Sequence, residues 1–265
     1  MSDYKFSEGK KSIRCAVFTG GDAPEPEALR SYFASHAPDI VIAADSGLDT
    51  FKRFADAFRN DESARINVQP DFIVGDFDSI SDTKLLDFYG VSHGAENGSA
   101  SRIERFPRDK DFTDTELALD AAFREASLRG GIPHITLIGG GGGRFDHLLA
   151  VFDSFSAPHH ADAWLLPREA VYFLSSGATA EIDLLKADDI ISVSRTSKAR
   201  SGGSLFSKGL RWEHFRAEGM PSISNRISEN YFVDKKPVTI GARGADFLLI
   251  VPLAASVTFR RQESR

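Results

Sequence analysis

Two aspartates, Asp76 and Asp78, come after the apolar residues 72–74 and Gly75, and a single residue separates them. In an extended segment residues i and i+2 share one face, so both carboxylates can point to the same spot. Close carboxylates repel each other, and a hard divalent cation such as Mg²⁺ relieves this repulsion and also binds phosphate oxygens. Asp45 follows the apolar residues 41–44 in the same way. The pattern indicates a magnesium-dependent enzyme that transfers phosphate or pyrophosphate. A solvated turn explains an isolated Asp-x-Asp pair, and helix capping explains Asp45 alone.

A second acidic segment, 109–114, precedes a stretch with helical spacing. Thr113 or Asp111 can cap that helix, and Asp114 suits the positive end of its dipole. Capping accounts for only part of the acidity of this segment. Lys110 lies inside it and offers a cation for a phosphate group.

A run of five glycines ends at Gly142 and Gly143, and Arg144, Asp146 and His147 follow it. Glycine lets the backbone approach a phosphate closely, and the start of a helix attracts anions. The run lacks the Gly-Lys-Ser/Thr of a Walker loop and the register of a dinucleotide-binding fingerprint. We expect its amides and the Arg144 guanidinium to bind nucleotide phosphates, with Asp146 holding Arg144 in place. His147 suits a capping or packing role better than that of a base.

Apolar runs alternate with helical patterns through about residue 165. Strands are expected at 13–18, 39–44, 70–74, 103–106 and 135–138, and helices at 27–34, 48–58, 83–89, 114–127 and 145–155. This alternation predicts an α/β domain with a doubly wound, mainly parallel sheet. Such sheets bind ligands beyond the carboxyl ends of their strands. The acidic and glycine-rich breaks therefore fall along one edge of the predicted fold.

The second part of the chain has a different texture. After about residue 167 long helical patterns stop, and short apolar runs alternate with turn residues. This predicts a smaller antiparallel β-sandwich domain or partial barrel. The expected domains are residues 12–166 and 167–260. The Ser-, Gly-, Lys- and Arg-rich segment 195–208 is expected to be a mobile connection between strands.

The 265 residues are 42% hydrophobic and 26% charged, with a formal net charge of −6. We do not expect such a chain to bind nucleic acid or an anionic membrane through its overall charge. No apolar stretch approaches the roughly 20 residues of a membrane-spanning helix, and the polar first residues do not predict a targeting segment. The single cysteine, Cys15, lies in an apolar run and is expected to be a buried thiol in a reducing cytoplasm.

Polar and aromatic residues of the second part can recognise an organic substrate. Trp212 can stack on a flat heteroaromatic ring, and Ser222, Ser224 and Asn225 can hydrogen-bond to its edges. From the residues alone, a core tryptophan and an ordinary polar turn are the simpler interpretation.

Together these segments resemble the thiamine pyrophosphokinase family. The resemblance rests on short segments in the family's order, spanning about residues 13–255: Ala44-Asp45-Ser46-Gly47, Gly75-Asp76-Phe77-Asp78-Ser79, Asp109-Lys110-Asp111-Phe112-Thr113-Asp114, Gly142-Gly143-Arg144-Phe145-Asp146-His147, Gly209-Leu210-Arg211-Trp212 and Ser222-Ile223-Ser224-Asn225. The chain departs from the family's usual residues at Ser46, Phe112 and Ser207-Lys208.

The resemblance implies an ATP- and Mg²⁺-binding α/β domain followed by a thiamine-binding β-sandwich. It implies a homodimer, with each site between the α/β domain of one subunit and the β domain of the other. The implied reaction moves the terminal pyrophosphate of ATP to the thiamine hydroxyl and leaves AMP. Mg²⁺ would be held by Asp45, Asp76, Asp78 and Asp114, and the nucleotide by Lys110, Asp111, Thr113, Gly142, Gly143, Arg144, Asp146 and His147. Thiamine would pack on Trp212, with Ser222, Ser224 and Asn225 near its pyrimidine.

Three alternatives remain from the sequence. The segment 76–79 also resembles the loop of haloacid dehalogenase-type phosphatases, in which Asp76 would be the nucleophile and Asp188 and Asp189 the later acidic pair. A related pyrophosphokinase would act on a pterin-like alcohol. A non-catalytic nucleotide-sensing module would bind ATP without turnover.

Overall fold

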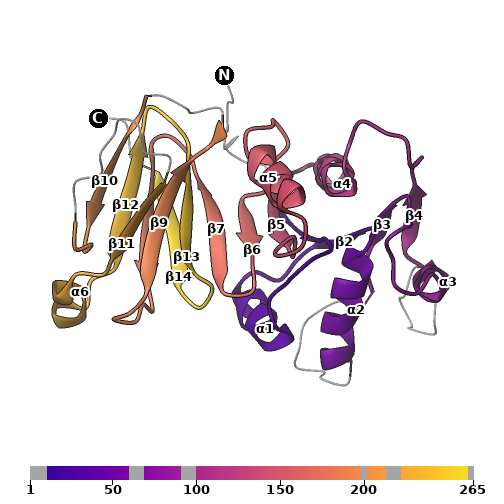
Figure 1. Cartoon of the computed structure of the whole chain (residues 1–265), viewed down its shortest axis with the longest axis horizontal. Helices are drawn as coiled ribbons and strands as arrows, with labels where there is room; N and C mark the ends of the chain where they lie inside the picture. Colours follow the sequence, from indigo (N-terminus) through magenta and orange to yellow (C-terminus); the bar gives the residue numbers. More distant parts are fainter. Residues whose placement is uncertain (1–10, 60–68, 91–99, 198–201, 213–221, 262–265) are drawn as a thin grey trace. The chain divides into compact units, whose positions relative to one another are not determined.

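The computed structural model of the chain describes residues 11–59, 69–90, 100–197, 202–212 and 222–261. The chain forms two compact units, Met1–Pro167 and Arg168–Arg265 (Figure 1). The first unit contains the acidic and glycine-rich segments, and the second contains Trp212 and Ser222 to Asn225. Within the described ranges, no helix is both long and apolar enough to cross a membrane.

The first unit is built on a parallel sheet. Its strands are β1 (Lys11–Phe18), β2 (Ile40–Ala44), β3 (Phe72–Gly75), β4 (Arg102–Arg105), β5 (Gly131–Ile138) and β6 (Ala163–Leu165). They lie in the order β6-β5-β1-β2-β3-β4, and every adjacent pair is parallel. The chain adds strands on one side of β1 as far as β4 and then crosses to the other side for β5. The strand order therefore reverses between β1 and β5, and ligands bind at such switch points.

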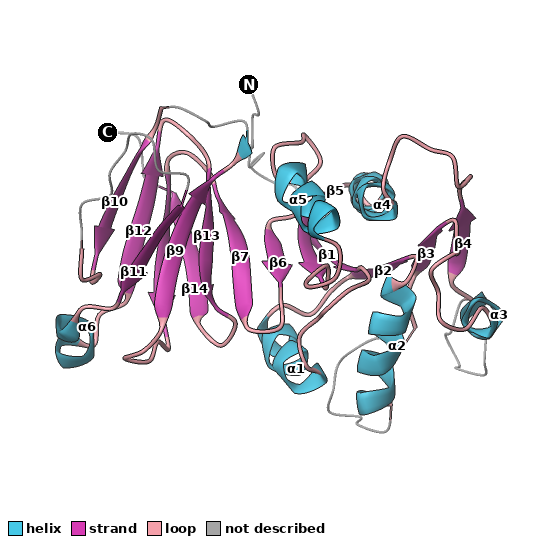
Figure 2. Ribbon diagram, viewed as in Figure 1, coloured by secondary structure: helices cyan, strands magenta, loops and turns pink. Residues whose placement is uncertain are grey.

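Helices cover both faces of this sheet. They are α1 (Pro26–Ser35), α2 (Gly47–Phe58), α3 (Lys84–Gly90), α4 (Asp114–Leu128) and α5 (Phe145–Ser154). In Figure 2, α1 and α2 lie on one face, and α4 and α5 on the other. Phe18 of β1 packs on Phe51 and Phe54 of α2, with ring centroids 5.2 and 5.8 Å apart. Burying each such ring contributes roughly 1.5–3 kcal/mol, which fixes α2 and the loop before it against the sheet.

Aspartates cap the amino ends of three strand pairs. Each lies directly before its own strand, and its carboxylate accepts a backbone N–H of the neighbouring strand. The donors to Asp39, Asp71 and Asp162 are Arg14, Val41 and Ile135, at 2.9, 2.7 and 2.7 Å. The aspartate N–H in turn donates to the carbonyl of the same residue, at 2.8 Å in each case. The carboxylates therefore satisfy amides that have no further strand residue opposite them.

The described part of the second unit contains eight strands, all in antiparallel pairs, and one short helix. The strands are β7 (Glu169–Leu174), β8 (Ala178–Asp183), β9 (Ile190–Arg195), β10 (Ser204–Lys208), β11 (Ser222–Arg226), β12 (Val238–Arg243), β13 (Phe247–Pro252) and β14 (Ser256–Arg261), and the helix is α6 (Glu229–Asp234). Four of these strands lie in the order β11-β9-β13-β7, and the other four form a sheet in the order β10-β12-β8-β14. Buried and part-exposed residues alternate along β8, as expected for a strand with one face in a core.

The structure corrects two details of the sequence interpretation. Strand β5 begins at Gly131, four residues before the predicted start at residue 135. Pro133 has no N–H to donate, and its position explains why the strand accepts it. The N–H of Ile135 points towards β6 and donates to Asp162, so residue 133 faces the same side, at a level where β6 has not yet begun. The segment 195–208 is also not simply a connection, because Ser204–Lys208 forms β10 and pairs with β12. Residues 198–201 of that segment lie outside the described residues.

Candidate active site

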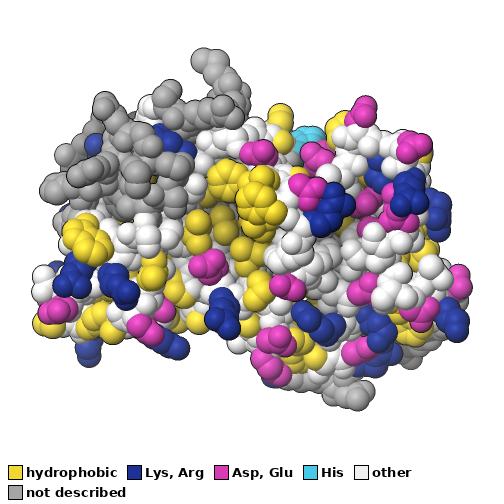
Figure 3. Space-filling view, in the orientation of Figure 1, with side chains coloured by type: hydrophobic (Ala, Val, Ile, Leu, Met, Phe, Trp, Pro, Cys, Tyr) yellow, Lys and Arg dark blue, Asp and Glu magenta, His cyan; other side chains and the backbone are white. Residues whose placement is uncertain are grey.

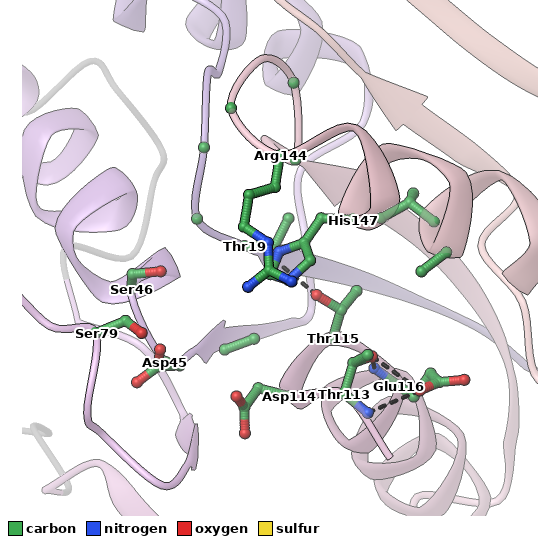
Figure 4. A pocket seen from close by; sticks show the side chains of 18 of the residues that line it. Thr19, Asp45, Ser46, Ser79, Thr113, Asp114, Thr115, Glu116, Arg144 and His147 are labelled. Carbon is green, nitrogen blue, oxygen red and sulfur yellow. Dashed lines mark hydrogen bonds between the residues drawn. The ribbon is translucent and has the colours of Figure 1, made fainter. Parts of the chain in front are cut away.

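A cavity of about 420 Å³ opens at the carboxyl ends of the strands of the first unit. Its walls come from the loops that follow β1, β2, β3 and β5, from the first turn of α4 and from one face of α5. Figure 4 shows Asp45, Ser46 and Ser79 on one side of this cavity and Arg144 and His147 on another. The cavity therefore lies at the switch point between β1 and β5.

Three aspartates meet beside this cavity. Asp45, Asp76 and Asp78 each offer an oxygen within 4.8 Å of the others, and we call these three residues the acid cluster. Asp45 is only 6% exposed. Among the described residues, nothing hydrogen-bonds to its Oδ1. A buried carboxylate oxygen without a hydrogen-bond donor is costly unless a cation binds it, so this oxygen is suited to be a metal ligand.

Gly75 allows the acidic residues to approach each other. Its φ is +151°, and an added Cβ would lie 3.1 Å from the Cβ of Asp45 and 3.3 Å from Oδ1 of Asp114. Asp114, the first residue of α4, is thus brought beside the acid cluster. Asp45 and Phe77 also have positive φ angles, of 45° and 66°. Unusual backbone conformations of this kind concentrate at functional sites.

Lys110 lies between two of the acids. Its Nζ is 3.0 Å from Oδ2 of Asp76 and 3.1 Å from Oδ1 of Asp114, and the Lys110 side chain is 12% exposed. Burial acts to raise the pKa of Asp76, but Lys110 and the Asp78 amide outweigh it and leave this pKa lowered. Burial alone would lower the pKa of Lys110, but the carboxylates of Asp76 and Asp114 raise it by more, so the pKa is raised overall. The ammonium group is a resident counter-charge.

The pKa of Asp45 moves in the other direction. Burial raises it first, and the charges of Asp114 and Asp76 raise it further, against hydrogen bonds from Ser46 and Ser79. Asp45 therefore disfavours its own charge until a cation is present. At the outer end of the cluster, Arg108 Nε lies 3.0 Å from Oδ2 of Asp78.

The glycine run packs against the loop that follows β1. Gly140 donates its N–H to the carbonyl of Gly20 at 2.6 Å, and Gly141 pairs with Asp22 in both directions. The N–H groups of Gly140 and Gly141 are therefore already used in hydrogen bonds within the protein. In the described part of the chain, no protein group accepts the N–H of Gly142 or Gly143, so these two remain for a ligand.

Arg144 and Asp146 form an exposed ion pair at the start of α5. Arg144 donates to Asp146 through Nε at 3.1 Å and through Nη2 at 2.5 Å. The hydrogen bond from Arg144 lowers the pKa of Asp146. His147 is exposed and lines the cavity one residue further on. The pair holds a planar guanidinium at the mouth of the cavity, ready for an anion.

The start of α4 forms another wall. Thr113 and Glu116 make a reciprocal capping box, in which Thr113 Oγ1 accepts the N–H of Glu116 at 3.2 Å. Thr115 Oγ1 lies 2.8 Å from Thr19 Oγ1, which joins α4 to the loop after β1. The Thr113 side chain is therefore already engaged, and Asp111 is exposed and does not line the cavity.

Comparisons with known proteins agree with this geometry. A family model described as thiamin pyrophosphokinase, catalytic domain, matches residues 33–163, which include the acid cluster, Asp114 and Arg144. Residues 33–163 belong to the thiamine pyrophosphokinase family.

Solved structures of the family share the fold. A thiamin pyrophosphokinase family protein from Enterococcus faecalis is 19% identical, with a TM-score of 0.58 over 91% of this chain and 98% of that protein. Thiamin pyrophosphokinase from Geobacillus thermodenitrificans is 18% identical, with a TM-score of 0.59 over 91% and 97% of the two chains. Yeast thiamin pyrophosphokinase is 18% identical, with a TM-score of 0.56 over 92% and 87%. No curated protein sequence matches the chain.

The second unit contains the residues that resemble the family's thiamine side. Asn225 is buried, donates from Nδ2 to the Trp212 carbonyl at 2.6 Å, and accepts the Trp212 N–H at 3.3 Å. Asn225 therefore holds the backbone of Trp212 in place, while the Trp212 side chain is 57% exposed. Ser224 directly precedes Asn225 on β11, so the backbone directs its side chain to the opposite face; the side chain of Ser222 lies outside the described part of the chain.

The match to the thiamin pyrophosphokinase model argues against the phosphatase alternative. Asp188 and Asp189 belong to the second unit, where Asp189 accepts the N–H of Lys186 at 2.7 Å. They do not line the cavity of the first unit.

Figure 3 shows acidic and basic side chains interspersed over the drawn face of the first unit, without a continuous basic band among its described residues.

Some lining residues were not predicted. Ala150, Val151 and Ser154 line the cavity together with His147. Their spacing of three, four and seven residues from His147 puts them on one face of α5, so helical periodicity applied to His147 would have found them. No local pattern would have found Thr115, because its partner, Thr19, lies in the loop after β1.

Proposed function

We propose that the cavity of the first unit binds ATP with Mg²⁺ and that this family member transfers the terminal pyrophosphate to the hydroxyl of thiamine. The products are thiamine diphosphate and AMP. The observation that carries the proposal is the convergence of Asp45, Asp76 and Asp78 beside a cavity whose other wall is a glycine loop. A metal-ligand set and an anion-binding loop in one cavity suit a metal–nucleotide complex.

The acid cluster fits Mg²⁺ by its chemistry. Carboxylate oxygens are the ligands that this ion prefers, and the donor-free Oδ1 of Asp45 is available to it. Asp45, Asp76 and Asp78 would hold the ion, with Asp114 bound directly or through water. Bound there, Mg²⁺ would neutralise phosphate charge and help to orient the transferred group.

The chain's own groups would position the nucleotide phosphates. The N–H groups of Gly142 and Gly143 and the guanidinium of Arg144 are available as donors, and the positive end of α4 favours negative charge nearby. Asp146 would orient Arg144. Lys110 would contact a phosphate once a metal ion replaces it as counter-charge of the carboxylates. Asp111 and the Thr113 side chain have no such direct role in this arrangement, because one lies outside the cavity and the other caps α4.

The transfer would be an in-line displacement. The thiamine hydroxyl oxygen forms a bond to the β-phosphorus, and the bond from that phosphorus to the oxygen bridging it to the α-phosphorus breaks. AMP leaves with the bridging oxygen. The hydroxyl proton passes to a carboxylate of the site or to water. Catalysis of this kind depends chiefly on positioning and charge neutralisation, which is what the cavity supplies.

The remaining assignments belong to the same proposal. Residues 12–166 would be the ATP- and Mg²⁺-binding domain, and residues 167–260 the thiamine-binding β-sandwich. The exposed Trp212 ring supports the second role, because a flat apolar ring is available to stack on thiamine. Ser222 and Ser224 would hydrogen-bond the pyrimidine, and Asn225 would act by holding Trp212. A homodimer with shared sites and a cytoplasmic location follow from the resemblance and the sequence, and sedimentation of the purified protein tests the first.

The deciding assay supplies purified protein with ATP, Mg²⁺ and thiamine and measures AMP and thiamine diphosphate. Thiamine-dependent release of AMP is the expected result. Asp78→Asn should lower the rate at least about 100-fold, since even outer-shell changes at metal sites cost 10–100-fold. Asp87→Asn, at an exposed position of α3 outside the cavity, is the matched control and should be unaffected. Full activity of Asp78→Asn would reject the metal assignment. AMP release with a pterin-like alcohol but not with thiamine would change the acceptor and leave the phosphate chemistry standing.

A further inference from the structure

The turn that joins two members of the acid cluster is held in an unfavourable backbone conformation. Phe77 lies between Asp76 and Asp78, has a φ of 66°, and is 5% exposed. Bulky side chains rarely adopt this left-handed conformation. It persists only where neighbouring groups over-determine it, so some part of the structure must hold Phe77 in place.

Arg105 makes the contacts that can do this. It is the last residue of β4 and lies opposite Gly75 in the parallel register with β3. Its guanidinium carbon is 4.7 Å from the centroid of the Phe77 ring. Its Nη1 also donates to the carbonyl of Asp76 at 3.1 Å. A single planar group therefore fixes both the ring of Phe77 and the peptide that precedes it.

We propose that Arg105 is a positioning residue for the acid cluster, which keeps the Asp76 and Asp78 carboxylates converged with Asp45 by clamping the turn at Phe77. The inference rests on the proposed function, because it takes the cluster to be a divalent-cation site. Within the described ranges, Arg105 makes no hydrogen bond or ion pair with a carboxylate oxygen of the cluster, and it does not line the cavity. Its role is therefore to shape the turn, and the cation and nucleotide bind elsewhere.

The sign of a single measurement separates positioning from simple charge. Arg105 is a cation close to three acids, so its removal would strengthen binding of a divalent cation if charge alone mattered. If Arg105 holds the ligands in place, its removal weakens binding, because the turn must be reordered each time the ion binds. The two interpretations predict opposite changes in the same dissociation constant.

The experiment titrates the full-length protein with Mn²⁺, without nucleotide, and measures free Mn²⁺ by electron paramagnetic resonance. Mn²⁺ is a suitable probe because it shares the oxygen-ligand preference of Mg²⁺. Arg105→Met keeps the length of the side chain and removes the guanidinium. We expect it to weaken Mn²⁺ binding about tenfold, which corresponds to the loss of about 1.4 kcal/mol. The Mg²⁺ concentration for half-maximal activity should rise similarly, while kcat at saturating Mg²⁺ changes little.

Arg102→Met is the matched control. Arg102 lies on the same strand and its guanidinium also lies over a phenylalanine ring, that of Phe72, at 5.8 Å, but it does not touch the acidic turn. Its Mn²⁺ affinity should equal that of the wild type. Unchanged or tighter Mn²⁺ binding by Arg105→Met overturns the inference. Absence of Mn²⁺ binding by the wild type itself overturns the metal site of the proposed function, which is a separate result.

A double-mutant cycle tests the clamp directly. Phe77→Leu keeps an apolar side chain and removes the ring face that Arg105 contacts. If the ring and the guanidinium act together, the double variant should bind Mn²⁺ about as weakly as the weaker single variant. Fully additive losses would show that Arg105 acts without Phe77 and would overturn the proposal. A melting curve of each variant confirms that it is folded.

Discussion

Replacement of Lys110 by Met tests the electrostatics of the site. The change keeps most of the apolar stem and removes the ammonium that lies 3.0 Å from Asp76 and 3.1 Å from Asp114. Without it, the largely enclosed carboxylates of Asp76 and Asp114 lose the counter-charge that they share. The first unit should then be less stable when no metal is present.

The size of the effect follows from burial. The Lys110, Asp76 and Asp114 side chains are 12%, 11% and 24% exposed. Breaking a buried pair costs roughly 3–5 kcal/mol, and the lower value applies here because the cavity admits water. A loss of about 3 kcal/mol lowers the melting temperature by roughly 6–12 °C for a domain of this size. Mg²⁺ should restore more of the lost stability to the variant than it adds to the wild type, because the ion takes the place of the ammonium.

The assay is thermal unfolding in EDTA and again in millimolar Mg²⁺. Lys52→Met is the control, because Lys52 pairs with Asp56 on the exposed surface of α2, and such pairs contribute only about 0.2–1 kcal/mol. If Lys110→Met melts like the wild type in EDTA, the ammonium is not a structural counter-charge. If Mg²⁺ stabilises wild type and variant equally, Lys110 and the metal do not compete for the same carboxylates.

Three further predictions concern the supports of the site. Asp71→Ala should destabilise the protein by about 1–3 kcal/mol in urea unfolding, because the Val41 amide loses its acceptor. Asp71→Asn keeps an acceptor. Burial raises the pKa of Asp71 in the folded state, so ionisation of Asp71 destabilises the folded wild type as the pH rises above about 4. Asp71→Asn cannot ionise, so its stability relative to the wild type should increase between that pH and neutral pH. Equal stability of the two proteins at every pH would contradict this. Thr113→Val removes the capping box with Glu116 and should cost about 1 kcal/mol, measured in the same way, and no change would show that α4 is held by other contacts. Gly75→Ala should abolish Mn²⁺ binding, because the added Cβ meets the acid cluster at a φ of +151°, and normal binding would mean that this turn adjusts freely.

The sequence was informative where a single strand and the break after it carry the signal. An apolar run followed by Asp45, or by Asp76 and Asp78, shows both the strand and its carboxyl end. The parallel sheet then brings such ends to one edge. The capping box at Thr113 is equally local, since it needs only a threonine and a glutamate three residues apart. Each of these features depends on residues that are neighbours in the chain.

Features that depend on the register between strands could not be predicted in this way. Lys110 was expected to meet a phosphate, but the loop after β4 places its ammonium between Asp76 and Asp114. Gly140 belongs to a run that suggested a phosphate cradle, yet its amide pairs with Gly20 across the β1–β5 switch point.

Arg105 shows the same dependence most clearly. It has no motif of its own, and only the pairing of β3 with β4 sets it opposite Gly75 and over the ring of Phe77. A change of one residue in that register would turn its side chain to the other face of the sheet and leave the acidic turn without its clamp. The ligand residues of such a site can therefore be read from local sequence, while the residues that hold them in place depend on how the strands pair.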